Sequence, residues 1–417
     1  MMIWFGIAAI IVTIYFLVKR YDARMVLIAS GIIMCLSVKA PMDAFKAFAT
    51  NMTNAGLIQA VCSVMGFAMV MKYTECDKHL ITLIGNFLAK VRPLLIPGAV
   101  IGTFVINVAL PSAAGTAAAV GAIFIPILIG AGVHPAMAAA AVKSGTYGSM
   151  LNPGLVHNPM VAKIAGVNVM DVIAFHYKAN IASVIIAGIV ITFLAYILKE
   201  HKGYETDSFK VDSSFKPNFV YALVPIMPIA ILLLCTRPEF KSVNMTVPAA
   251  MIIGVLIGLA VTRKNPAKMV KAFFDGMGGA YADIIGIIVA AGVFVSGLTA
   301  VGLVKAFIAA MTSMPSIVKI CAAVGPFLLG VISGSGDAAT VAFNNAVTPH
   351  AAEFGLSTLQ MGSMATLGGT LGRTMSPIAG ATIICAGIAG ANPMDVAKRT
   401  CPGVTLAMLV GMFLLMF

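Results

Sequence analysis

Long apolar runs follow one another through this sequence and restrict what it can fold into. The first run, MIWFGIAAIIVTIYFLV at residues 2–18, contains no charged side chain. At 1.5 Å of rise per residue, a helix of about 20 such residues crosses the roughly 30 Å hydrocarbon layer of a bilayer. The 417 residues are 60% hydrophobic and only 10% charged, which excludes a soluble globular protein. We therefore expect an all-α polytopic membrane protein. Its first run should be a retained span, because no positive region precedes it and no small-residue cleavage site follows.

The net charge of +12 invites a nucleic-acid interpretation, but the basic residues are scattered over short loops rather than gathered on one face. Short cytoplasmic loops of membrane proteins are enriched in Lys and Arg. Most of the 27 Lys and Arg residues fall on the cytoplasmic side if both chain termini are periplasmic. The seven cysteines form no CxxC pair, so neither a disulfide framework nor a metal cage is indicated, and no cofactor is expected.

An internal repeat is visible by eye. AVKSGTYGSMLNPGLVHNPMVAKIAGVNVMDV begins at Ala141, and ATLGGTLGRTMSPIAGATIICAGIAGANPMDV begins at Ala365, an offset of 365 − 141 = 224 residues. Two glycines, a threonine, a proline and the closing N-x-M-D-V residues coincide without a gap. Further upstream, PMDAFKAF at Pro41 matches PAKMVKAF at Pro266. This agreement is too extensive for shared membrane composition and indicates a duplicated unit.

The repeat divides the chain into four parts. We expect a first transmembrane helix and cytoplasmic loop at 1–24, repeat 1 at 25–198, a cytoplasmic linker and connecting transmembrane helix at 199–247, and repeat 2 at 248–417. An odd number of predicted crossings separates equivalent points of the two copies, so the repeats should be inverted in the membrane. Each copy should hold a helical hairpin, at 94–130 and 315–354, and a broken helix, at 135–164 and 357–390.

Small and polar residues interrupt the apolar runs in both hairpins and both broken helices. The hairpin tips read PSAAGT and SGSGDAAT, and the broken helices contain SGTYGSMLNP and GGTLGRTMSP, each ending in a proline that lacks a backbone donor. Irregular backbone at membrane depth is tolerated only where it is buried in protein or lines a wet cavity. We therefore expect two re-entrant hairpins and two unwound helices to meet halfway through the membrane, where free N–H groups favour carboxylates.

Two cations in these segments narrow the class of ligand. Arg373 lies inside the second broken helix, where an ionised guanidinium is costly unless it faces a partner or a cavity. Its planar fork suits bidentate carboxylate binding, and the alternative is a structural ion pair with Asp337. Lys143 precedes the first break. It would bind a second carboxylate of the substrate, or else extend its ammonium group toward the membrane surface.

Asp337, at the second hairpin tip, has three interpretations: a cap of the following helix, a neutralising partner of Arg373, or the carrier of the coupling proton or cation. His157 and His350, near helix ends, have two interpretations: groups that titrate, or, as is more common for a lone histidine there, hydrogen-bonded spectators. The remaining candidates for substrate binding are hydroxyl and amide side chains at the tips and breaks: Ser112, Thr116, Thr146, Asn152, Ser333, Ser335, Thr340, Thr370, Thr374 and Ser376. No catalytic residue and no metal ligand is assigned.

At SGSGDAATVAFNNAVTPH (333–350) and MATLGGTLGRTMSPIAGA (364–381), the sequence resembles the anaerobic C4-dicarboxylate carriers of the DcuC type, in the ion transporter superfamily. The resemblance covers essentially the whole chain. It implies secondary active transport of succinate, fumarate or malate across the bacterial inner membrane, by exchange, uptake or efflux. It also implies a homodimer whose transport domain moves like an elevator against a scaffold domain.

One departure from the superfamily concerns the coupling ion. Sodium-coupled dicarboxylate carriers of the superfamily carry Ser-Asn-Thr at both hairpin tips, which this sequence lacks. The sequence therefore favours proton coupling or exchange over sodium coupling. Related members move gluconate and other acids, so another organic acid remains an alternative substrate.

Residues 334–337 also spell GxGD, the signature of intramembrane aspartyl proteases. Such an enzyme shares a proton between two embedded aspartates, the second normally in a Tyr-Asp pair. The only such pair in this sequence is Tyr21-Asp22, in a predicted loop, and Asp283 lacks the motif. An open channel fits paired hairpins less well than alternating access does. The sequence therefore predicts a transporter rather than an enzyme.

Overall fold

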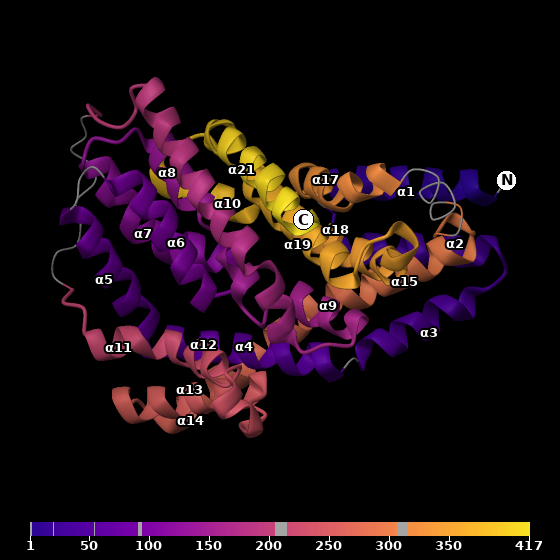
Figure 1. Cartoon of the computed structure of the whole chain (residues 1–417), viewed down its shortest axis with the longest axis horizontal. Coiled ribbons are helices and arrows are strands. Elements are labelled where there is room, and N and C mark those ends of the chain that lie inside the picture. The colour runs from indigo at the N-terminus through magenta and orange to yellow at the C-terminus, as the bar shows by residue number, and fades with distance from the viewer. Residues whose placement is uncertain are drawn as a thin grey trace.

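The computed structural model describes residues 2–19, 21–53, 55–90, 94–204, 215–304, 306 and 315–417. Every regular element in these ranges is a helix, so the predicted all-α class is confirmed (Figure 1). Within them, five helical stretches are long and apolar enough to cross a membrane: Ala113–Gly130, Val169–Ile197, Pro266–Ala300, Thr358–Ala389 and Pro393–Met416. Shorter apolar helices accompany them, as expected of a multi-pass membrane protein.

The described part of the first half contains α1 (Met2–Val18), α2 (Ala23–Ser37), α3 (Pro41–Met52), α4 (Ala55–Thr74), α5 (Cys76–Lys90), α6 (Leu95–Ala109), α7 (Ala113–Gly130), α8 (Pro135–Ser144), the 3-10 turn η2 (Gly148–Leu151), α9 (His157–Ala165) and α10 (Val169–Ile197). The predicted connecting transmembrane helix is divided into α11 (Phe219–Leu223), η3 (Val224–Ile226) and α12 (Met227–Leu234). Pro225 and Pro228 lie in this division, and neither has a backbone N–H to donate to a regular helix.

The described part of the second half contains η4 (Pro238–Val243), α13 (Val247–Thr262), α14 (Pro266–Ala280), the π turn η5 (Tyr281–Ile285), α15 (Gly286–Ala300), α17 (Pro315–Ser333), α18 (Gly336–Ala346), η6 (Thr348–Phe354), α19 (Thr358–Met375), α20 (Gly380–Ala389) and α21 (Pro393–Met416). The series α6 to α10 therefore has its counterpart in α17 to α21, at the offset of the sequence repeat.

The packing between the two copies is reciprocal. Helix α3 packs on α15, and its counterpart α14 packs on α4; likewise α2 packs on α15 while α13 packs on α4. Helix α7 packs on α20, and α18 packs on α9. Reciprocal contacts of this kind are what an approximate two-fold relation between two copies produces. The direction of each copy through a membrane stays a prediction.

The shared N-x-M-D-V residues start the last helix of each copy. The side chain of Asn168 accepts a hydrogen bond from the N–H of Met170 at 3.0 Å, and that of Asn392 accepts one from Met394 at 2.8 Å. Both residues are N-caps, which satisfy backbone donors that a helix start leaves free. The repeat thus preserves a helix start rather than a binding site here.

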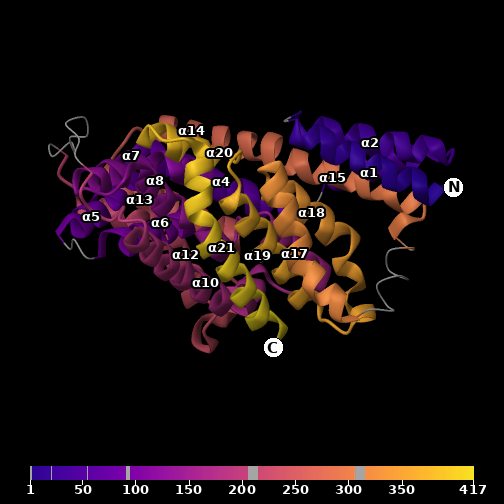
Figure 2. The same cartoon turned by 90° about the horizontal axis from the view of Figure 1, so that it is seen from above.

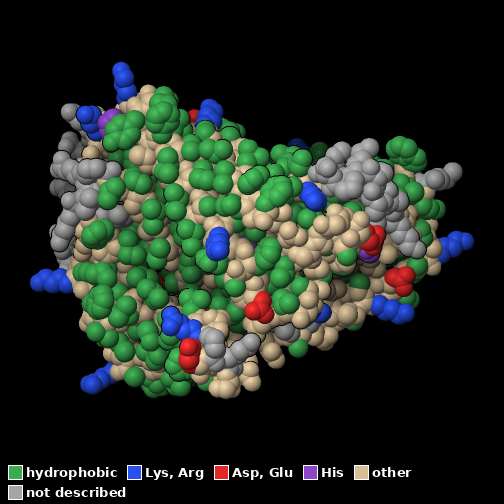
Figure 3. All heavy atoms as spheres, viewed as in Figure 1, with side chains coloured by type: hydrophobic (Ala, Val, Ile, Leu, Met, Phe, Trp, Pro, Cys, Tyr) green, Lys and Arg blue, Asp and Glu red, His purple; other side chains and the backbone are tan. Residues whose placement is uncertain are grey.

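Helix α10 is apolar on its outer face and small or polar on its inner face. Ile185, Ile189 and Phe193 are exposed, whereas Asn180 and Ser183 are buried. A soluble protein would reverse this arrangement, but lipid accepts large apolar side chains while helix contacts favour small ones. Figure 3 shows hydrophobic side chains over most of the visible face, with Lys and Arg sparse upon it.

The described core consists of separate groups of helices. The largest hydrophobic cluster joins α6 to α8 and α10 with α17, α19, α20 and α21. A second cluster lies among α2, α4 and α15 and includes residues of α9 and α18, and a third lies among α4, α13 and α14. In both views, α1 and α2 lie beside α15 at one end of the molecule, while α10 and α21 cross its middle (Figures 1 and 2).

Glycines let the hairpins approach the broken helices closely. A Cβ atom on Gly148 would lie 2.1 Å from the carbonyl oxygen of Phe104 in α6, and one on Gly372 would lie 2.1 Å from that of Phe327 in α17. Both obstacles are backbone atoms, so no side-chain rotation could relieve them. The glycines of both segments are therefore required for packing. Only the first segment is unwound as expected, because α19 stays helical past Gly372 to Met375 and the second break is confined to the residues around Pro377.

An ion pair ties the end of repeat 1 to the last helix. Arg399 of α21 donates from Nε to Glu200 Oε2 at 2.7 Å and from Nη2 to Oε1, and both side chains are largely buried. The Glu200 carbonyl also accepts from the N–H of His134, at 2.9 Å, so the segment after α10 is held from two sides.

Arg399→Gln should lower the free energy of unfolding by about 1.5–3 kcal/mol, because it leaves a shielded carboxylate without its charged donors. The neighbouring Lys398 pairs with Asp395 at 3.3 Å in an exposed position, so Lys398→Gln should cost less than about 1 kcal/mol. Thermal unfolding in detergent, followed by size exclusion, compares the two. Equal losses would show that the Glu200 contact adds no stability.

A second ion pair, at the exposed start of α2, predicts a pH effect. The side chain of Asp22 caps α2 and accepts hydrogen bonds from the Arg24 guanidinium, which lowers the pKa of Asp22 from 3.8 to about 2. A depressed folded-state pKa stabilises the fold above pH 3.8, and this stabilisation is lost as the pH falls towards 2. Asp22→Asn keeps the cap but loses the charge. It should lower stability by less than about 1 kcal/mol at pH 7, and the difference from wild type should vanish near pH 2 in thermal unfolding. A difference that persists at that pH would contradict the assignment.

Candidate functional site

Two helices stop inside the protein, one in each copy. Helix α8 ends at Ser144, and the chain passes through turns and η2 before α9 begins at His157. Helix α19 ends at Met375, and the chain resumes as α20 at Gly380. Lys143 lies in the last turn of α8, and Arg373 lies in the last turn of α19. Each helix thus carries a cation to its C-terminal end, where the dipole favours positive charge.

Arg373 reaches from repeat 2 to repeat 1. Its Nη2 donates to the Thr146 carbonyl oxygen at 3.2 Å, and its Nη1 lies 3.6 Å from Asp337 Oδ1. The side chain is only 11% exposed, and its Nε has no hydrogen-bond partner among the described residues. The guanidinium group is therefore held in place, but several of its N–H donors are unused and can bind a carboxylate.

Lys143 is buried, and its Nζ donates to the Arg373 carbonyl oxygen at 3.1 Å. The ammonium group does not extend toward a membrane surface, so that alternative is wrong. A backbone carbonyl satisfies only one of its three N–H donors. Two cations consequently lie beside each other, which favours the binding of an anion between the repeats.

Asp337 sits in the first turn of α18 and pairs with Arg373 rather than capping its helix. Ser335 is the N-cap of α18 and makes no side-chain cap hydrogen bond. Asp337 Oδ1 lies 3.5 Å from His157 Nε2 and, among the described residues, has no hydrogen-bond partner. The structure therefore excludes the hydrogen-bonded capping role and retains the pairing one.

His157 is more than a hydrogen-bonded spectator. It is fully buried at the start of α9, and neither ring nitrogen has a hydrogen-bond partner in the described part of the chain. The spectator interpretation of His157 was therefore wrong, since a spectator of that kind would be hydrogen-bonded. His350 does behave as predicted, since its Nδ1 lies 2.8 Å from Glu353 Oε1 on the surface of η6.

The hydroxyl groups of the first hairpin tip form hydrogen bonds within the tip itself. Ser112 caps α7 by accepting from the N–H of Gly115 at 3.1 Å, and Thr116 donates to the Leu110 carbonyl at 3.0 Å. Thr116 also accepts from Asn107 Nδ2 at 3.1 Å. Both side chains therefore shape the tip in this structure.

The same holds for most candidates at the second tip and the breaks. Ser333 donates to the Leu329 carbonyl, Thr340 to that of Ala365, Thr146 to that of Lys143, Thr370 to that of Thr366 and Thr374 to that of Thr370. Asn152 donates to the Val108 carbonyl, and Ser376 accepts from the N–H of Ile378. Ser335 remains, half-buried and without a side-chain cap bond.

Several buried polar residues were missed by the sequence reasoning. Asn107 of α6 accepts from the N–H of Ser149 at 2.8 Å and so joins the first hairpin to the first break. The Tyr147 hydroxyl, Asn158 Oδ1 and the Asn180 amide have no partner among the described residues. A lone polar residue in an apolar run is the signal that could have revealed Asn107 and Asn180.

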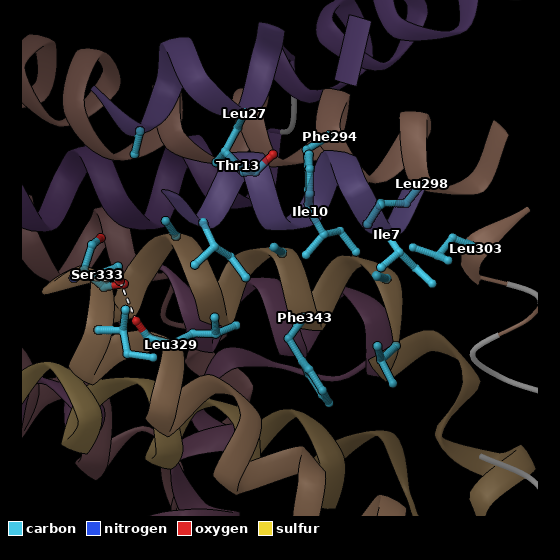
Figure 4. A pocket seen from close by; sticks show the side chains of 18 of the residues that line it. Ile7, Ile10, Thr13, Leu27, Phe294, Leu298, Leu303, Leu329, Ser333 and Phe343 are labelled. Carbon is cyan, nitrogen blue, oxygen red and sulfur yellow. Dashed lines mark hydrogen bonds between the residues drawn. The ribbon is translucent and has the colours of Figure 1, made fainter. Parts of the chain in front are cut away.

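A large apolar cavity borders the second hairpin. It has a volume of about 710 Å³ and lies between α1, α2 and α15 on one side and α17 and α18 on the other. Figure 4 shows Ile7, Ile10 and Phe294 on the first side, with Ser333 and Phe343 on the hairpin side. The hairpin is therefore loosely packed on this face, whereas its glycines hold it tightly to α19.

The chain is similar to known transporters in sequence and in fold. The model of the DcuC family, the C4-dicarboxylate anaerobic carriers, matches residues 1–417. A protein of Haemophilus influenzae named as an uncharacterized transporter is 41% identical over 279 residues, which cover 64% of this chain and 100% of the relative. The anaerobic C4-dicarboxylate transporter DcuC of Escherichia coli K12 is 24% identical over 441 residues, covering 97% and 94% of the two chains.

A solved structure is similar in fold. The YdaH transporter of Alcanivorax borkumensis, described as having an unusual topology, matches with a TM-score of 0.61 and 15% sequence identity. The match covers 89% of this chain and 86% of that one. At this identity the likeness concerns the fold alone.

Proposed function

Because the chain belongs to the DcuC family of C4-dicarboxylate anaerobic carriers, we propose that it is a secondary active transporter of succinate, fumarate or malate in the bacterial inner membrane. The family consists of transporters, not enzymes. Transport would proceed by alternating access, with the site between the two breaks open to one side at a time. The observation that carries the proposal is the buried pair of cations, Lys143 and Arg373, at the ends of two interrupted helices.

The cations account for the charge of the substrate. In this proposal the Arg373 fork binds one carboxylate in a bidentate manner, and Lys143 contributes to binding the other. Ser335 and Asp337, at the second tip, are only half-buried and would meet the substrate from the hairpin. The candidate hydroxyls that now bond to nearby carbonyls would act mainly by shaping the tips and breaks.

The proposed motion is that of an elevator. The largest hydrophobic cluster would form the transport domain, and the clusters built on α2, α4, α13, α14 and α15 would form the scaffold. Support comes from the reciprocal contacts between the copies and the apolar cavity along one face of the second hairpin. Residues of α9 and α18 also pack into the cluster built on α2, α4 and α15, so the proposed motion would have to exchange these contacts. A homodimer, periplasmic termini and inverted repeats complete the proposal.

Counterflow tests this function directly. Purified protein in liposomes loaded with fumarate should accumulate external labelled succinate, whereas liposomes without internal dicarboxylate should not. Gluconate inside the liposomes is the matched comparison. Accumulation driven by gluconate and not by fumarate would replace the dicarboxylate with another organic acid.

The structure does not support the alternative that the chain is an aspartyl protease. Asp337 pairs with Arg373 and His157, while the side chain of Asp283 is 78% exposed and pairs with Arg24 at 3.3 Å. Two aspartates that share a proton must lie side by side, and these two have different partners.

A further inference from the structure

Four charged or titratable side chains surround the contact between the repeats: Lys143, Arg373, Asp337 and His157. With Lys143 counted as protonated and histidine as neutral, their formal charges sum to +1 − 1 + 1 = +1. A dicarboxylate of charge −2 would bring the site to −1. An uncompensated charge in a buried site is costly, so one further positive charge is required for a neutral complex.

His157 is placed to receive that charge. Its Nε2 lies 3.5 Å from Asp337 Oδ1, across the boundary between α9 of repeat 1 and α18 of repeat 2. Both ring nitrogens and this carboxylate oxygen lack hydrogen-bond partners among the described residues. Buried polar atoms are normally hydrogen-bonded, so we expect these three atoms to gain hydrogen bonds in another state of the protein. A proton placed between imidazole and carboxylate would form one of them, as a charge-assisted hydrogen bond.

Of the side chains on the elements packed around His157, the imidazole itself and the Asp337 carboxylate are the pair that can share a proton. Helix α18 contributes Asp337, and α19 contributes Arg373, which stays charged at all relevant pH values. Helix α10 contributes His176, whose Nε2 already lies 2.9 Å from the Met150 carbonyl oxygen. From α4 comes the buried Cys62, and η6 carries His350 and Glu353, which pair with each other on the surface. Lys163, on α9 itself, is exposed.

We infer that His157 and Asp337 together take up one proton when a dicarboxylate binds and release it when the dicarboxylate leaves. This rests on the proposed function of the same site. The substrate carboxylate replaces Asp337 on the Arg373 fork, and the released Asp337 carboxylate turns to the imidazole. A proton from the aqueous phase on the open side joins the His157–Asp337 pair, and the same proton returns to water after the carrier opens on the other side.

Calorimetry of succinate binding counts this proton. The heat of binding is measured for the full-length protein in two buffers of different ionisation enthalpy, and its dependence on the buffer gives the protons taken up per succinate. Wild type should take up one proton. His157→Gln should bind succinate more weakly and take up none. The control His350→Gln should match wild type, because His350 pairs with Glu353 rather than with Asp337 or Arg373.

Asp337→Asn is the second variant tested in the same calorimetric experiment. Without its carboxylate the site carries +2, which already balances a dicarboxylate, so this variant should bind succinate without taking up a proton. Proton uptake equal to wild type in both His157→Gln and Asp337→Asn would overturn the inference, as would binding by wild type without proton uptake. No succinate binding by wild type, together with no counterflow, would instead reject the proposed function.

Discussion

Arg373→Ala should reduce succinate counterflow by about 30-fold or more, since losing one member of a buried charge pair costs on the order of 2–5 kcal/mol. Arg373 is the cation that spans the repeats, with its Nη2 on Thr146 and its Nη1 near Asp337. In the proposed function, removing it leaves a carboxylate of the substrate without its donors; in the structure it leaves Asp337 without its counter-charge. Initial rates of labelled succinate uptake by liposomes containing equal amounts of folded protein measure the effect.

Two further variants identify the reason for the loss. Arg373→Lys keeps the charge but not the fork, so it should recover only a minor part of the rate if bidentate geometry matters. Arg237→Ala removes an exposed arginine and should leave transport unchanged. Wild-type rates in Arg373→Ala, with folded protein, would remove Arg373 from the substrate site.

Gly372→Val should destabilise the protein by at least about 3 kcal/mol, because overpacking at a close contact cannot be relieved without moving a backbone. The first added carbon alone would lie 2.1 Å from the Phe327 carbonyl oxygen. To accept it, α17 must move away from α19, which separates the second hairpin from the second broken helix. The temperature at which the monodisperse peak is lost in size exclusion, measured after heating in detergent, reports the change.

Gly387→Val is the matched control. Gly387 also lies in a helix of the second copy, α20, but a Cβ atom there would meet nothing within 4 Å. Valine and glycine differ by less than about 0.5 kcal/mol in helix propensity, so this variant should stay near wild-type stability. Similar losses in both variants would show that valine in these helices, rather than the close contact, causes the effect.

Features that depend on local sequence were predictable. The hairpin tips, both breaks and the last helix of each copy were expected from Gly, Ser, Pro and the repeated N-x-M-D-V residues, and each rests on backbone preferences within a few residues. Arg373 was predictable for another reason: an arginine in an apolar segment is costly, so it needs a partner wherever the segment lies.

Features that depend on the relative position of distant helices were not predictable. His157 and Asp337 are 180 residues apart, and their contact exists only because α9 packs on α18. The sequence equally could not tell that Thr116 and Thr340 would bond to nearby carbonyls, because a hydroxyl at a tip can turn either way. Lys143 had two open interpretations for the same reason, and the packing of α8 against α20 and α21 excluded one of them.

The apolar cavity beside the second hairpin determines what kind of molecule can fill it. Its lining runs from Ile3 and Ile7 of α1 to Ser333 and Ser335 at the hairpin tip and is mostly hydrocarbon. A lipophilic compound that fills it should therefore hold α1 against the hairpin, in a place that neither Lys143 nor Arg373 lines.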